Sequence, residues 1–90
     1  KLFDAAINEY ITAQRFNADR PESQVNLANL YIARGERSDA EAALLKAIEL
    51  DKTFAPAYVA LAENRRSQGY EAGAEAVLRD GLEKNPEAAV

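Results

Sequence analysis

A chain of 90 residues can enclose one small hydrophobic core or form part of a repetitive array, but it is too short for two separate domains. Nineteen residues are Ala and only seven are Phe or Tyr, so the apolar content suits closely approaching helices better than one thick core. Because the sequence lacks Cys and His and has 11 basic against 15 acidic residues, it argues against disulfides, thiolate metal sites and nucleic-acid binding.

The first predicted element is a helix within residues 1–20. Apolar side chains recur there at helical spacing. The helix that would pair with this one is expected to lie before Lys1. The apolar face of this helix comprises Phe3, Ala6, Ile7, Tyr10, Ala13 and Phe16.

Two further helices are predicted within residues 21–54. Pro21 can begin the first of them without losing a needed N–H, and Gly35 can end it in the left-handed conformation. Ser38 and Glu41 have the spacing of a capping box, which predicts the start of a second helix that runs through Leu50.

Residues 55–88 repeat this plan, with Pro56 at the start of a helix, Gly69 at the break and Pro86 after the last helix. Gly73 and Gly81 fall inside that last helix and each costs about 1 kcal/mol of helix propensity, so we expect it to be the weaker one. Alternating strand patterns are absent. The fold is therefore predicted to be all-α, with five helices.

An internal repeat of 34 residues relates the two halves of the chain. Residues 21–54 and 55–88 share nine identical positions, where this composition gives about three by chance. Most of these positions are small or apolar, as expected when each unit buries the same face against its neighbour. The identical pairs are Val25/Val59, Leu27/Leu61, Ala28/Ala62, Gly35/Gly69, Ala40/Ala74, Glu41/Glu75, Ala42/Ala76, Leu44/Leu78 and Glu49/Glu83.

The repeat resembles the tetratricopeptide repeat in its length and in the order of its small and large residues. Tyr58 takes the place where this family usually has Trp or another bulky residue, whereas Lys52 replaces a usual Pro and Arg65 replaces a usual buried aromatic or Leu. The other matching positions are Asn26 to Tyr31, Gly35, Ala40, Leu44, Ala47, Leu50 and Asp51 in one unit, and Leu61, Ala62, Gly69, Tyr70, Ala74, Leu78, Gly81, Asn85 and Pro86 in the next. Another α–α repeat is the alternative.

This resemblance implies antiparallel helix-turn-helix repeats stacked in a right-handed superhelix, that is, an α-solenoid. Residues 1–20 would be the second helix of a truncated repeat, and residues 21–54 and 55–88 would be two complete repeats of one continuous array. A looser resemblance, in Asn26 to Tyr31 and Pro56 to Ala62, is to the repeat region of bacterial proteins that join such repeats to a multihaem cytochrome segment. The haem-attaching motif of that segment is not in this sequence.

Tetratricopeptide arrays bind a peptide or a helix of another protein in a concave groove lined by their first helices, and the resemblance implies the same function here. The candidate binding residues lie on the faces of those helices that turn away from the partner helix. They are Val25, Asn26, Asn29, Ile32, Val59, Glu63 and Arg66. The amides offer donors and acceptors to a ligand backbone, and the aliphatic residues offer apolar area. The alternatives are packing against an adjacent repeat for the aliphatic residues and simple solvation for the others.

Structural roles are expected for the aromatic residues Tyr10, Tyr31 and Tyr58, which we interpret as core or inter-helix side chains. Arg65 is interpreted as a snorkelling side chain or as half of an ion pair with a carboxylate of a nearby helix. No nucleophile motif, Gly-rich phosphate loop or metal-ligand spacing occurs, so neither an enzyme nor a cofactor site is predicted.

The alternative function is that of a structural spacer or self-association module. A solenoid needs polar capping units, and both ends of this chain lack them. A homodimer could form through apolar residues expected to face solvent there: Phe3, Ile7, Tyr10, Val77, Leu78 and Leu82. The same ends lead us to expect a fragment of a longer, multidomain bacterial protein. No secretion signal or membrane-spanning run is apparent, and the chain is compatible with the cytoplasm or the periplasm.

Overall fold

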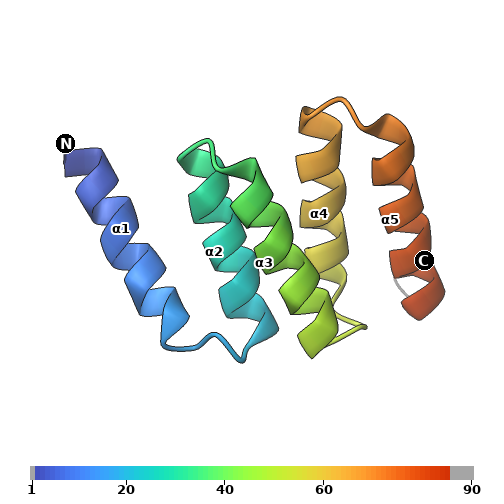
Figure 1. Cartoon of the computed structure of the whole chain (residues 1–90). Helices are drawn as coiled ribbons and strands as arrows, with labels where there is room; N and C mark the ends of the chain where they lie inside the picture. Colours follow the sequence, from blue (N-terminus) through green and yellow to red (C-terminus); the bar gives the residue numbers. More distant parts are fainter. Residues whose placement is uncertain (1, 86–90) are drawn as a thin grey trace.

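The computed structural model describes residues 2–85 and consists there of five α-helices joined by short turns. The helices follow one another across the molecule in chain order, as Figure 1 shows, and the Cα extents are 42 × 28 × 20 Å. Their bounds are α1 Leu2–Arg15, α2 Pro21–Ala33, α3 Arg37–Leu50, α4 Ala55–Ser67 and α5 Glu71–Lys84. The described part of the chain is thus all-helical, which confirms the predicted fold class.

Two helix pairs dominate the packing. α2 packs most extensively on α3, and α4 on α5, while α3 also contacts α4 and α1 rests on α2. A further contact joins α2 to α4, the two helices that begin with or next to a proline. Within the described residues, each pair therefore contacts the next one.

Glycine ends the first helix of each pair by the same turn. Gly35 and Gly69 have φ of 79° and 86°, the left-handed region that only Gly adopts cheaply. In the first turn the amide of Glu36 donates to the carbonyl of Tyr31 at 2.8 Å; in the second, the amide of Tyr70 donates to that of Arg65 at 2.9 Å. These are Schellman bonds, which satisfy carbonyls left free at a helix end.

The predicted capping box at Ser38 and Glu41 is wrong. α3 begins at Arg37, so Ser38 lies inside the helix, and Glu36 occupies the N-cap position without a side-chain hydrogen bond. The reason is the Schellman turn, which is closed by the amide of Glu36. The carbonyl of Glu36 then accepts a hydrogen bond from the amide of Ala40 at 3.1 Å and begins the helix. The backbone enters the helix two residues earlier than the side-chain pattern indicates.

Small residues form the contacts between helices, as the alanine content predicts. Ala28, Ala40, Ala47 and Ala74 are completely buried, and Ala62 is 1% exposed. Because a methyl group lets two helix backbones approach closely, these positions allow tight packing without large side chains. The bulkier core residues fill the remaining space: Ile7, Ile11, Leu27, Leu44, Tyr58, Leu61 and Val77.

Several sequence expectations for exposure are wrong. Ile7 and Val77, expected to face solvent, are buried because α1 packs on α2 and α5 on α4. Tyr10 is largely exposed, as expected for an uncovered end but not for a core or inter-helix side chain, and exposed Phe16 lies beyond the end of α1. Tyr31 and Tyr58 have the expected structural roles, since Tyr31 packs against the core and Tyr58 is buried within it. The side chain of Phe3 lies outside the described residues.

Polar contacts fix the junction between the pairs. Asn64, almost completely buried near the end of α4, donates through Nδ2 to the carbonyl of Arg37 at 3.2 Å. In return, Nη1 of Arg37 donates to Oδ1 of Asn64 at 3.3 Å and to the hydroxyl of Ser67 at 2.7 Å. A buried amide without such partners would be destabilising, so this reciprocal contact specifies how α3 meets α4.

The turn from α3 to α4 forms without the proline usual at Lys52. Asp51 accepts hydrogen bonds from the amide and the hydroxyl of Thr53 at 2.9 and 2.7 Å, and these bonds lower the pKa of its carboxyl. The hydroxyl of Tyr58 also donates to the carbonyl of Lys52 at 2.7 Å. Side-chain bonds of this kind stabilise a turn locally.

Candidate binding surfaces

The predicted amides Asn26 and Asn29 lie together in an open hollow between α1 and α2. Its volume is ≈ 340 Å³, and its other lining residues are Tyr10, Gln14 and Leu30. Both Asn side chains are exposed, and Nδ2 of Asn26 makes only a long contact of 3.4 Å, to Oε1 of Gln14. Tyr10 is 62% exposed and adds an aromatic surface. A hollow with amides beside an exposed aromatic can accept a peptide backbone and a neighbouring side chain.

Val59 lies in a second hollow, between α4 and α5, of ≈ 270 Å³. Tyr58, Leu78 and Leu82 line it with Val59, so its surface is mostly apolar. Burial raises the pKa of the Tyr58 phenol, and the charges of Asp80 and Asp51 raise it further. The hydroxyl therefore stays protonated and keeps its donor bond to the turn before α4.

The remaining predicted residues divide between packing and solvent. Val25 and Ile32 are half-buried and pack against the core, so they offer less apolar surface than Val59. Glu63 and Arg66 are exposed on α4, and Nε of Arg66 lies 3.0 Å from Oε1 of Glu71. Exposed ion pairs of this kind contribute little to stability, which leaves Arg66 available to a ligand.

The two helix pairs differ in how well equivalent positions are covered. The side chain of Val59 is 48% exposed, whereas that of Val25, at the equivalent position 34 residues earlier, is less exposed and packs against the core. Likewise the side chain of Leu82 is 46% exposed, whereas the equivalent Ile48 is less exposed and packs against the core. α4 stacks on the first pair, and no described helix stacks in the same way on the second, so apolar side chains remain uncovered at the α4–α5 end.

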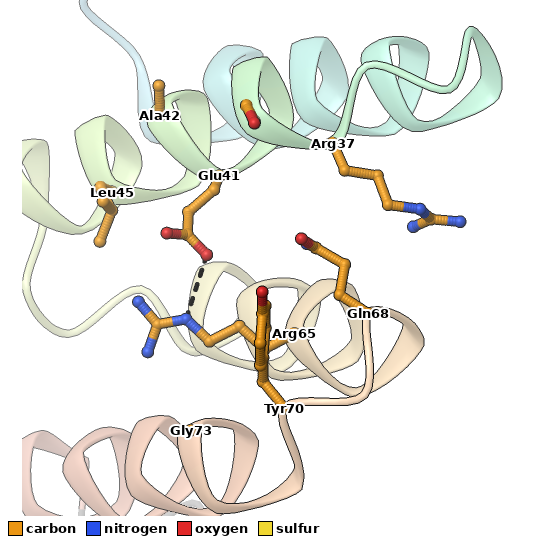
Figure 2. Close-up of a pocket in the computed structure, with 9 residues that line it drawn as sticks. Arg37, Glu41, Ala42, Leu45, Arg65, Gln68, Tyr70 and Gly73 are labelled. Atoms are coloured by element: carbon orange, nitrogen blue, oxygen red, sulfur yellow. Dashed lines mark hydrogen bonds and ion pairs between the residues drawn. The ribbon is translucent and has the colours of Figure 1, made fainter.

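A hollow of ≈ 570 Å³ that the sequence did not predict lies between α3, the end of α4 and the start of α5. Figure 2 shows Glu41 and Arg65 turned toward each other across it, with Nε of Arg65 at 3.1 Å from Oε1 of Glu41. This ion pair confirms the interpretation of Arg65. The signal for the hollow was present in the sequence, because Arg65 occupies a position that the resembled family fills with a buried apolar residue.

Metal binding finds no support in the described residues. Within residues 2–85 no group of three or more Asp and Glu side chains is arranged to hold an ion. None of the helices described in this part of the chain combines the length and apolar character needed to cross a membrane.

Comparison with protein families finds one match, to the tetratricopeptide repeat, at residues 21–54. These residues contain α2 and α3, the more extensively packed pair, together with the turn that leads to α4. None of the curated proteins compared with the chain matches it. The looser resemblance to multihaem cytochrome proteins has no support in these comparisons.

Proposed function

On the premise that residues 21–54 match the tetratricopeptide repeat, we propose that this chain is a scaffold that binds a segment of a partner protein along α2 and α4. Repeats of this family generally mediate protein–protein interaction and are typically non-enzymatic. The observation that carries the proposal is the hollow between α1 and α2, where exposed Asn26 and Asn29 lie beside exposed Tyr10.

The surface suits an extended segment better than a small molecule. It is open and shallow, and its amides are not committed to short hydrogen bonds with other side chains. Asn26 and Asn29 could donate to and accept from a peptide backbone while Tyr10 packs on a side chain. Further along the array, exposed Glu63 and Arg66 on α4 would contact charged or polar groups of the same segment.

We expect the double variant Asn26→Ala and Asn29→Ala to lose partner binding without losing its fold. Each exposed amide that bonds a ligand contributes about 0.5–1.5 kcal/mol, so the pair should weaken binding roughly tenfold or more. The measurement is recovery of proteins from an extract of cells that make the natural protein, followed by titration of the recovered partner.

Asn17→Ala is the matched control, because Asn17 is an exposed amide in the turn after α1 and does not line the hollow. Its recovery should equal that of the unchanged chain. Equal recovery by the double variant would contradict a binding role for the α1–α2 hollow and would favour a spacer.

Self-association is the second candidate function, and the uncovered α4–α5 end favours it. Val59 and Leu82 are both about half exposed there and border an apolar hollow. Exposed apolar area next to a hollow commonly marks a contact with another helix. A second copy of the chain would bury this area if its own apolar helix face packed against α4 and α5.

We expect sedimentation of the chain at high concentration to show a dimer that Leu82→Glu converts to monomer, because burying an unpaired carboxylate at an apolar contact is costly. Leu45→Glu is the matched control, since Leu45 is equally exposed but lies on α3, outside this hollow. A monomer at every concentration, or a dimer that both variants abolish equally, would contradict an interface at the α4–α5 end.

A further inference from the structure

The ≈ 570 Å³ hollow between α3 and α5 has walls of mixed chemistry. Arg37, Glu41 and Leu45 come from α3, Arg65 from α4, and Tyr70 directly precedes α5. None of the candidate residues on α2 and α4 lines it, so it is a surface separate from the one proposed above. It owes its presence to Arg65, whose polar head is held at the surface by Glu41 where the family usually buries an apolar side chain.

The charge of this hollow is opposite to that of the chain. Arg37 and Arg65 line it against the single carboxylate of Glu41, although the whole chain has a net charge of −4. Arg37 donates its described hydrogen bonds to the uncharged groups of Asn64 and Ser67, and neither group neutralises its positive charge. The region therefore attracts a negatively charged group.

Arg65 retains unused donors. Its Nε bonds to Glu41, whereas its two Nη groups have no hydrogen-bond acceptor among residues 2–85. A guanidinium presents five N–H donors in a planar fork that matches a carboxylate. Arg65 is only about a quarter exposed, so its orientation is held by its surroundings before any ligand arrives. A ligand carboxylate would accept hydrogen bonds from the Nη donors that Glu41 leaves unused.

Apolar side chains flank this polar centre. Leu45 is 47% exposed on one wall and Tyr70 is 61% exposed on the other, a large exposure for such residues. Figure 2 shows Tyr70 beside Arg65 and Leu45 on the facing helix, with the Glu41–Arg65 ion pair between them. Aliphatic side chains of a ligand would pack against Leu45 and Tyr70, on either side of this pair. The occupant thus needs a carboxylate next to an aliphatic group.

We propose that this hollow binds an acidic segment of a partner protein, in which an Asp or Glu carboxylate meets the Nη groups of Arg65. Aliphatic side chains of the same segment pack against Leu45 and Tyr70, on either side of the Glu41–Arg65 pair. The chain then has a second binding surface on its α3–α5 side, which can be occupied independently of the α2 and α4 surface.

The test is a titration of the ¹⁵N-labelled chain with the peptide acetyl-Leu-Glu-Leu-Glu-Leu-amide, followed by amide chemical shifts. We expect shifts that saturate and that concentrate at Leu45, Tyr70 and Gly73. The neutral peptide with Gln in place of both Glu should bind roughly tenfold more weakly, because charge-assisted bonds to the guanidinium are lost. Both titrations are run at the same ionic strength.

Two variants identify the residue responsible. Arg65→Gln should weaken binding of the acidic peptide roughly tenfold, and the matched control Arg79→Gln, at an exposed arginine of α5 that does not line the hollow, should leave it unchanged. Glu41→Gln should strengthen binding, because it removes the carboxylate that competes for Arg65 while it keeps the side-chain shape. This increase cannot result from a loss of folded protein.

Equal binding of the acidic and neutral peptides would overturn the proposal, as would equal losses for Arg65→Gln and Arg79→Gln. Shifts centred on Asn26, Asn29 or Val59 would overturn it too, since the peptide would then occupy the other surface. The absence of any shift at millimolar peptide would have the same meaning.

Discussion

We expect Leu44→Ala to lower the free energy of unfolding by about 3 kcal/mol, and the same substitution at Leu78 to lower it by about 1 kcal/mol. The two residues occupy equivalent positions, 34 residues apart. Leu44 is completely buried within the core, whereas Leu78 is only partly buried and lines the open hollow at the α4–α5 end. The cost of removing a buried side chain depends on the apolar area it covers and on the cavity it leaves.

Urea unfolding at low protein concentration measures both changes, and amide hydrogen exchange shows whether the second helix pair opens before the first. The comparison is well matched, because the residue type, the substitution and the position in the repeat are the same. If both substitutions lowered the free energy of unfolding equally, Leu78 would be as well buried in solution as Leu44. That result would contradict the exposure described for the second pair.

Gly81→Ala should destabilise the chain by about 1–3 kcal/mol, even though Ala is the better helix former by about 1 kcal/mol. A Cβ at Gly81 would lie 2.9 Å from both Cβ and Cγ of Tyr58, closer than packed carbon atoms allow. These atoms are near the backbone of Tyr58, so the clash cannot be relieved by moving a flexible chain end. α4 and α5 would have to move apart.

Gly73→Ala is the control for this prediction, because it makes the same substitution in the same helix. A Cβ there would meet Cδ of Arg65 at 3.5 Å and Cβ of Tyr70 at 3.7 Å, which are ordinary contacts. The gain in helix propensity then dominates, and thermal unfolding should show stabilisation of about 0.5–1 kcal/mol. A stabilising effect of Gly81→Ala would contradict the close approach of α5 to Tyr58.

The first helix pair suggests a rescue of Gly81→Ala. At the positions equivalent to Tyr58 and Gly81, residues 21–54 have Gln24 and Ala47, so a smaller residue on one helix accompanies a larger one on the other. In the background of Tyr58→Gln, adding Gly81→Ala should therefore cost nothing or stabilise. The difference between the two backgrounds measures the contact itself.

The parts of the fold that could be predicted from sequence are those set by backbone chemistry. Gly35 and Gly69 end their helices as expected, because their left-handed conformation excludes most other residues. Ala28, Ala40 and Ala74 are buried as expected, because the 34-residue repeat identifies the positions where helices touch. Both signals are local or periodic, so they can be read without knowing the three-dimensional arrangement.

The parts that could not be predicted depend on which helices meet. The exposure of Tyr10 and the burial of Ile7 depend on which face of α1 rests on α2, and a helical period alone does not identify that face. Burial of Asn64 depends on the carbonyl of Arg37, 27 residues away. The ≈ 570 Å³ hollow between α3 and α5 depends on Arg65 reaching Glu41 on another helix. Of these, only the unusual Arg65 could have been noticed in the sequence.

The contact between Asn64 and Arg37 also has a mechanical consequence. Its bonds join the first residue of α3 to the last turn of α4, and the hydroxyl of Ser67 adds another at 2.7 Å. A force that pulls α3 away from α4 would load all three hydrogen bonds, because each of them joins the two helices. We therefore expect tension to open the less extensive contact between α1 and α2 before it separates α3 from α4.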